Sequence, residues 1–236
     1  MPLDRKEQAE RVVRGLKELF PDADCELNFT TPLDLLVATI LSAQCTDERV
    51  NIVTAELFQK YHTAADYAAA DQETLEEEVH STGFFRQKSK AIRTMAQLLV
   101  AEFDGEVPKT IEEMTRLPGV ARKTANVVLG TAYGIPSGIP IDTHVRRVAY
   151  RLGLTDETDP DKIERDLMEI VPREEWVWFG HAVIWLGRRI CHARAPECSI
   201  CFLNEICPKR GVGGPTPGKR PRRAVKSAAQ LIEAGE

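Results

Sequence analysis

Two residues, Lys123 and Asp142, are of the types that nucleophilic attack at a sugar carbon requires. A lysine attacks carbon only as the neutral amine, so desolvation or nearby positive charge must lower the pKa of such a group. Arg122 is adjacent and would supply such charge. The amine displaces a leaving group and forms a Schiff base, while a carboxylate accepts a proton and stabilises a cationic, oxocarbenium-like sugar. Taken alone, however, Lys123 is typical of an exposed helix lysine and Asp142 of a helix N-cap.

The residues around Lys123 predict a helical hairpin. They are Leu117-Pro118-Gly119-Val120-Ala121-Arg122-Lys123-Thr124-Ala125, with helices predicted over 110–116 and 121–133. Unpaired N–H groups at the start of the second helix favour an anion through hydrogen bonds and the helix dipole. Gly119 permits a positive φ and a close approach of phosphate. A bare Leu-Pro-Gly fits an ordinary tight turn equally well, but the nine residues together resemble the DNA-binding helix-hairpin-helix motif.

Asp142 follows a glycine- and proline-rich loop. The loop, GIPSGIP, delivers it to the N-terminus of a helix predicted over 143–152, about twenty residues after Lys123. From Arg116 to Arg151 there are six basic residues and a single acid, Asp142. A lone carboxylate in this setting, after a lysine on a hairpin helix, favours a Lys/Asp pair across a cleft.

Four of the six cysteines lie close together near the C-terminus. Cys191, Cys198, Cys201 and Cys207 have the spacing C-x6-C-x2-C-x5-C. In a chain with no export signal, such a group indicates metal binding before disulfides. The spacing matches neither a typical zinc ribbon nor a ferredoxin pattern, so by itself it leaves zinc and a [4Fe–4S] cluster open.

The bulk composition bounds the class of protein. At 236 residues, 43% hydrophobic and 28% charged, the chain fits one large or two small globular domains. No apolar run approaches the ~18 residues of a membrane helix, and the charged N-terminus is not a secretory signal. We expect a cytoplasmic protein, associated with the nucleoid. The net charge of −5 argues against a nucleic-acid partner. The basic stretch over 116–151 would let one face meet an anion, although charge alone fits an ordinary solvated surface better.

Helical periodicity covers almost the whole chain and predicts an all-α fold. Helices are predicted over 4–20, 33–43, 47–60, 63–70, 72–80, 86–104, 110–116, 121–133, 143–152, 160–170 and 173–190. Thr31-Pro32 supplies an N-cap and a first-turn proline to the second helix, whose apolar sequence predicts burial. Gly105 and Gly153 stand where C-terminal caps are expected. From Gly211 onward the composition predicts a flexible basic tail over 211–236.

The hairpin around Lys123, the segment around Asp142 and the four-cysteine segment follow one another along the chain. Together they closely resemble the endonuclease III family of DNA glycosylases with AP lyase activity. The resemblance runs from about residue 4 to 210 and includes Leu41-Ser42-Ala43-Gln44, Asp47 and GFFRQKSK from Gly83 to Lys90. It implies a [4Fe–4S] cluster on the four cysteines, with Lys123 as nucleophile and Asp142 as catalytic carboxylate. The residues that it implies in DNA binding are Gln44, Phe84, Leu117, Gly119, Ala121, Arg122, Thr124 and His144.

Two of these positions would enter the duplex. By the resemblance, Gln44 fills the gap left by a flipped nucleotide and Phe84 presses into the stack opposite the lesion. Without the family, Gln44 indicates a polar helix-end residue and Phe84 a core aromatic. Phe84 replaces the usual leucine and Ala121 the usual glycine, so we expect changes in opposite-base preference and in the hairpin's phosphate contact.

The family fold implies two helical domains that flank a DNA-binding cleft. A six-helix barrel domain with the hairpin would span 25–134, while the N-terminal helix (1–24) would pack with the C-terminal helices and cluster loop (135–210). The implied partner is double-stranded DNA with a damaged pyrimidine of the thymine glycol type or an abasic site. The strand would be cleaved 3′ to the abasic site by β-elimination. We expect a monomer that binds no membrane.

Three other functions stay open at this point. A mismatch-specific monofunctional glycosylase of the same superfamily would share much of the architecture, although such enzymes usually lack the lysine. A non-catalytic DNA-binding module would use the hairpin as a phosphate clamp and need no Lys/Asp pair. An iron–sulfur electron carrier would explain the cysteines but leave the hairpin without a role.

Overall fold

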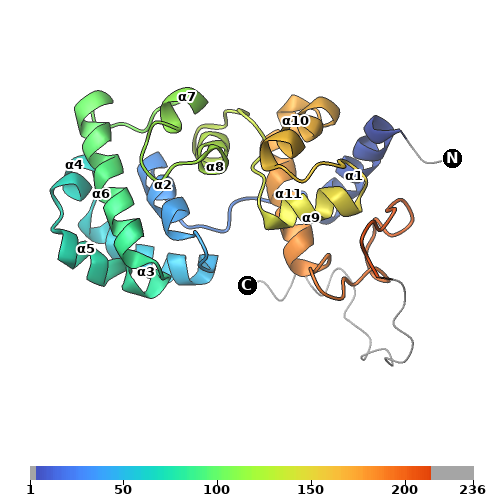
Figure 1. The fold of residues 1–236 in the computed structure, drawn as a ribbon, viewed down its shortest axis with the longest axis horizontal. Helices are drawn as coiled ribbons and strands as arrows, with labels where there is room; N and C mark the ends of the chain where they lie inside the picture. The colour runs from blue at the N-terminus through green and yellow to red at the C-terminus, as the bar shows by residue number, and fades with distance from the viewer. Residues whose placement is uncertain (1–3, 214–236) are drawn as a thin grey trace.

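The computed structural model describes residues 4–213, and all regular secondary structure within that range is helical (Figure 1). Its elements are α1 (Arg5–Leu19), α2 (Pro32–Leu41), α3 (Asp47–Lys60), α4 (Ala64–Ala69), α5 (Gln72–Val79), η1 (His80–Thr82), α6 (Phe85–Glu102), α7 (Ile111–Met114), α8 (Arg122–Tyr133), α9 (Thr143–Arg151), α10 (Pro160–Ile170), η2 (Arg173–Glu175) and α11 (Trp176–Arg189). The predicted all-α class is confirmed, and each predicted helix is present with ends within three residues of those expected. The predicted flexible tail lies, from residue 214, outside the described residues.

Local sequence sets the ends of these helices. Thr31 caps α2 as predicted, because its hydroxyl accepts from the Asp34 N–H at 3.1 Å and the Asp34 carboxylate accepts in return from the Thr31 N–H at 2.9 Å. Every residue of α2 after Pro32 is buried, which confirms the predicted burial of this helix. Gly153 follows α9 with a φ of 74° and donates to the Tyr150 carbonyl at 3.1 Å, as a C-terminal cap glycine does.

Buried apolar side chains form two separate clusters. One is built from α2 to α8 and the segments between them. The other joins α1 to α9, α10, α11 and the loop that follows. Figure 1 shows this arrangement: α1 lies beside α10 and α11, on the opposite side of the molecule from α2 to α6. The chain crosses between the two sides before α2 and again after α8. The domain boundaries near residues 24, 134 and 210 stay a prediction.

The two clusters meet where α8 contacts α10 and α11. A Cβ at Gly130 would lie 2.9 Å from a methyl group of Val177, so this glycine allows α8 to approach α11 closely. Beside it, the Glu164 carboxylate of α10 accepts from Arg122 Nε at 2.6 Å and from Arg122 Nη2 at 3.2 Å. It also accepts from Asn126 Nδ2 at 2.7 Å. The Glu164 side chain is only 4% exposed, so its charge is compensated inside the protein by groups of α8.

None of the helices within residues 4–213 combines the length and apolar character that crossing a bilayer requires.

Replacement of Glu164 by alanine should weaken the contact between the two clusters. The buried Asn126 amide would lose an acceptor, and an unsatisfied buried donor costs about 1–3 kcal/mol. We expect Glu164→Ala to lower the free energy of unfolding by about that amount, measured by thermal or urea denaturation. Glu169→Ala, at an exposed position of the same helix, is the matched control. Equal stability of the two variants would contradict the role given to Glu164.

Candidate active site and cysteine cluster

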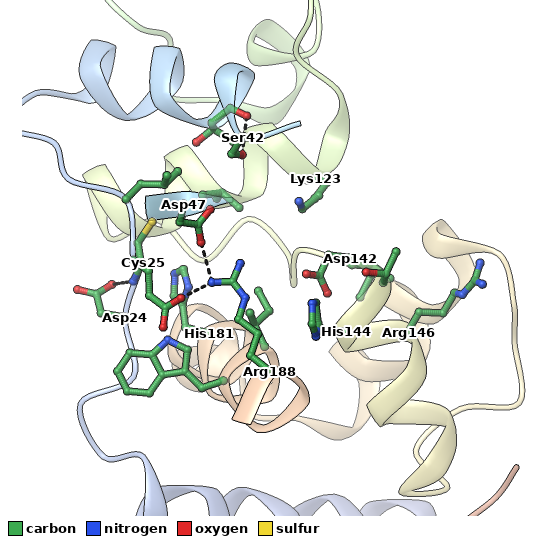
Figure 2. A pocket seen from close by; sticks show the side chains of 18 of the residues that line it. Asp24, Cys25, Ser42, Asp47, Lys123, Asp142, His144, Arg146, His181 and Arg188 are labelled. Atoms are coloured by element: carbon green, nitrogen blue, oxygen red, sulfur yellow. Dashed lines mark hydrogen bonds and ion pairs between the residues drawn. The ribbon is translucent and has the colours of Figure 1, made fainter. Parts of the chain in front are cut away.

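A cavity of about 460 Å³ lies between the two clusters (Figure 2). Lys123 of α8 and Asp142, at the start of α9, both line it, so the structure brings the two predicted residues to one cavity from different sides. The Lys123 side chain is exposed and Asp142 is half-buried. Removal of water from around the amine must therefore come from whatever molecule fills the cavity.

Asp142 is also the N-cap of α9. Its Oδ1 accepts from the Val145 N–H at 2.7 Å, which confirms the interpretation of Asp142 as a helix N-cap. Among the described residues, no side chain or backbone group donates to its second oxygen, Oδ2. The cap fixes the orientation of the carboxylate and leaves one oxygen directed to other partners.

The predicted hairpin is formed by α7, the turn and α8. Gly119 has a φ of 79°, and a Cβ at this position would lie 2.9 Å from that of Ala91, so both backbone and packing require glycine. Leu117 is 2% exposed and belongs to the apolar cluster built from α2 to α8, which leaves only its backbone for contact with a ligand.

Ala121 is the N-cap of α8 and offers no side-chain acceptor. The first N–H groups of this helix are thus not capped by a side chain, as an anion site requires. Thr124 lies half-buried in the same first turn.

The basic stretch over 116–151 does not face the cavity as a whole. Arg122 is bound to Glu164, so its charge is neutralised within the protein rather than directed at Lys123. Arg147 donates to the Cys191 carbonyl at 3.0 Å, and Arg151 to the His192 carbonyl at 2.7 Å. The stretch therefore does not present all of its charge to the cavity. Of its six basic residues, only Lys123 and Arg146 line the cavity.

Gln44 and Phe84 share an unusual backbone conformation. Their φ angles are 54° and 49°, in the left-handed region that residues other than glycine rarely adopt. Both side chains are exposed, Phe84 by 58%, so its interpretation as a core aromatic is wrong. Each such residue costs about 1–3 kcal/mol and persists where its surroundings impose it, often at functional sites.

His144 points into the cavity beside Asp142 (Figure 2). Burial lowers the pKa of its imidazole. Its Nδ1 lies 3.2 Å from Arg147 Nη2, which can donate to this nitrogen when the nitrogen carries no proton.

A group of ion pairs centred on Arg188, which the sequence did not predict, also lies at the cavity. Arg188 of α11 donates to the Asp47 carboxylate at 2.6 Å and also pairs with Glu26, from the segment before α2 (Figure 2). These pairs link the two sides of the cavity. His181 lies nearby, and burial lowers its pKa. No local pattern could have identified this group, because its members are separated by up to 162 residues.

The four C-terminal cysteines line one small cavity and are all half-buried free thiols. Thiolates of four cysteines are the usual ligands of an iron–sulfur cluster, and here all four face one cavity. Arg151 Nη1 lies 3.3 Å from Cys191 Sγ, a donor of the kind that stabilises a ligating sulfur. Burial raises the pKa of the Cys201 thiol to about 11, so a cationic centre is needed to hold it as thiolate. The residues therefore fit an iron–sulfur cluster.

Two family models match the sequence. Residues 37–173 match the HhH-GPD superfamily of base excision DNA repair proteins. Residues 191–207, which contain the four cysteines, match the iron–sulfur binding domain of endonuclease III.

Individual proteins are similar over most of the chain. Endonuclease III of Synechocystis sp. is 54% identical over 204 residues, which cover 86% of this chain and 93% of that protein. Endonuclease III of Bacillus subtilis is 43% identical over 201 residues, or 85% and 91% of the two chains. The structure of a trapped endonuclease III–DNA covalent intermediate, an estranged-adenine complex, is similar with a TM-score of 0.84. That chain is 43% identical, and the match covers 88% of this chain and 97% of the other.

The cap at Asp142 predicts a difference between two substitutions. Asp142→Ala removes the acceptor of the Val145 N–H and should cost about 0.5–2 kcal/mol of stability. Asp142→Asn keeps an acceptor oxygen and should remain within about 0.5 kcal/mol of the wild type. Thermal denaturation of both variants measures the difference. An equal loss in both would show that the carboxylate charge, and not the cap, stabilises α9.

Proposed function

The chain belongs to the endonuclease III family within the HhH-GPD superfamily of base excision DNA repair proteins, and it has DNA glycosylase and AP lyase activity. On this premise, we propose that it removes oxidised pyrimidines through a Schiff base on Lys123. The damaged base would be of the thymine glycol type, in double-stranded DNA. We propose that the protein acts as a monomer at the nucleoid.

The observation that carries the proposal is the placement of Lys123 and Asp142 on different sides of one cavity. A sugar held in this cavity would have an amine on one side and a carboxylate on the other. The similar structure of a trapped endonuclease III–DNA covalent intermediate supports a covalent step. A Schiff base between a lysine and C1′ is one such covalent bond.

In the proposed reaction, Lys123 Nζ attacks C1′ of the flipped nucleotide. The C1′–N bond breaks and the base leaves with its electron pair, while the amine loses a proton. Opening of the sugar ring gives a Schiff base between Nζ and C1′. The cationic imine makes the C2′ proton acidic, and its removal expels the 3′ phosphate by β-elimination. Water then releases Lys123.

Asp142 is proposed to stabilise the cationic sugar as the base departs and to accept the proton from the amine. Its cap bond to Val145 holds the carboxylate in place during these steps. The uncapped start of α8 would bind a backbone phosphate, with Gly119, Ala121 and Thr124 around it. Leu117 would contribute only its backbone, and contact of DNA with Arg122 would have to compete with Glu164.

Gln44 and Phe84 are proposed to enter the duplex from two loops. Both side chains are exposed, and strained backbones of this kind cluster at functional sites, which supports this role. Gln44 would fill the space of the extruded nucleotide, and Phe84 would press into the stack opposite it. His144, beside Asp142 in the cavity, would meet the sugar–phosphate backbone.

The protein contains an iron–sulfur cluster. We propose that it is a [4Fe–4S] cluster held by Cys191, Cys198, Cys201 and Cys207. When bound, it supplies metal–thiolate bonds that close the loop over 191–207. The loop is joined to α9 by Arg147 and Arg151, and α9 begins at Asp142, so the cluster would hold the helix that carries the carboxylate.

Borohydride trapping tests the assignment of Lys123. On a duplex with one abasic site, we expect the wild-type protein to give a covalent protein–DNA band and Lys123→Ala to give none. Lys6→Ala, at an exposed position of α1, should trap like the wild type. A band that persists in Lys123→Ala would identify another amine as the nucleophile, and no band with the wild type would exclude a Schiff-base lyase.

Asp142→Asn should separate catalysis from stability. Because the cap survives, we expect a folded protein whose excision of thymine glycol from duplex DNA is slower by about 10²- to 10⁴-fold. Single-turnover kinetics measure this rate. Excision close to the wild-type rate would show that the carboxylate charge is not needed.

The cluster assignment is tested by metal content. Cys201→Ala should lose most of the iron and acid-labile sulfide that the wild-type protein contains, because one of four ligands is removed. Cys25→Ala, at a half-buried cysteine outside the loop, should keep both. Full iron content in Cys201→Ala would show that the cluster has other ligands.

A further inference from the structure

Two short loops carry the residues proposed to enter DNA. The Gln44 loop, residues 42–46, follows α2, and the Phe84 loop, residues 82–84, begins at the last residue of η1 and precedes α6. Gln44 and Phe84 are each held in the left-handed region. Two side chains that enter opposite parts of one base-pair step must keep a fixed separation, so the two loops need a common anchor.

Lys88 of α6 lies between the two loops. Its side chain is buried, with the residue 5% exposed, and its Nζ donates to the Leu41 carbonyl at 2.7 Å and to the Thr82 carbonyl at 2.8 Å. Leu41 is the last residue of α2, and Thr82 is the last residue of η1. One ammonium group thus bonds to the start of each loop. The backbone N–H of Lys88 also donates to the Phe84 carbonyl at 3.1 Å.

The choice of lysine at this position has a physical reason. Carbonyl groups at the end of a helix lack intrahelical partners and carry partial negative charge, and an ammonium offers three donors to them. Within residues 4–213, no Asp or Glu forms an ion pair with Lys88. Burial without a carboxylate lowers its pKa. A methionine would fill the same space without the cost of burying a charge, so packing alone does not explain the lysine.

We propose that Lys88 is a positioning residue that fixes the Gln44 loop and the Phe84 loop to each other, so that both side chains enter the duplex together and extrude a paired nucleotide. This rests on the proposed roles of Gln44 and Phe84. Lys88 does not reach the cavity that contains Lys123, and it takes no part in the covalent step. Its loss should affect extrusion and leave the chemistry at Lys123 intact.

Extrusion of the nucleotide and the covalent step at Lys123 can be tested with different substrates. Extrusion of a base-paired thymine glycol requires unpairing and unstacking, whereas an abasic site has no pair to break and a single strand needs still less work. We therefore expect Lys88→Met to slow excision of thymine glycol paired with adenine by about tenfold or more. Borohydride trapping on single-stranded abasic DNA should stay within about threefold of wild type.

Lys90→Met is the matched control, since it makes the same substitution at an exposed position of the same helix and should leave both measurements unchanged. A second readout is 2-aminopurine placed opposite the lesion, in a Lys123→Ala background that blocks the reaction. Its fluorescence should rise on binding, and this rise should fall at least threefold when Lys88→Met is added. Where Lys88→Met does not fold, Lys88→Leu, which also removes every donor, takes its place.

The outcomes separate this proposal from the general one. Equal loss of excision and trapping in Lys88→Met would show a general structural role and overturn the proposal, as would unchanged excision or an unchanged fluorescence rise. Failure of the wild-type protein to trap abasic DNA at all would instead contradict the proposed Schiff-base function. Selective loss of excision from paired DNA, with trapping preserved, supports Lys88 as the anchor of both loops.

Discussion

The buried carboxylate of Glu164 is the group on which the geometry of the cavity depends. It binds Arg122, the residue directly before Lys123, and Asn126 one turn later on α8. The segment that leads to Asp142 packs against the same group, because a Cβ at Gly138 would overlap Glu164 Oε1. The helix of the proposed nucleophile and the approach to the proposed carboxylate therefore share one fixed reference. A buried charge is costly, and here it is balanced by a bidentate guanidinium and an amide, which makes the contact specific in direction as well as attractive.

Several of the basic residues near the cavity are likewise used in contacts within the protein. Arg122, Arg147 and Arg151 serve the protein itself, by pairing with Glu164 or by binding carbonyl groups of the cysteine loop. A chain with a net charge of −5 then has few cations left near the cavity for phosphate. At the cavity itself, binding of a polyanion would therefore draw on backbone N–H groups and a few side chains. The clustering of basic residues in the sequence did not predict which of them line the cavity.

The features predicted from the sequence are those that depend on neighbouring residues along the chain. The cap at Thr31, the turn at Gly119 and the helical periods are local signals, and the structure reproduces them. Lys123 and Asp142 were singled out by the family resemblance, since each alone is an ordinary helix residue. Glu164, Arg188 and Lys88 could not be found, because their partners are set by tertiary packing: Arg122 is 42 residues from Glu164, and Asp47 is 141 residues from Arg188. A lysine on a helix predicts exposure, and only the fold places Lys88 under two loops.

The starts of α8 and α9 show how one structural element gives the two sides of the cavity opposite electrostatic character. Helix N-termini carry partial positive charge and favour anions. At α8 the N-cap is Ala121, which supplies no acceptor, so the positive end remains for an external anion. At α9 the N-cap is Asp142, whose carboxylate compensates the dipole and adds negative charge of its own. In the proposed reaction the phosphate backbone is attracted to the first helix and the cationic sugar to the second. The cap interpretation and the catalytic interpretation of Asp142 are then parts of one explanation, because the bond that ends the helix also aims the charge.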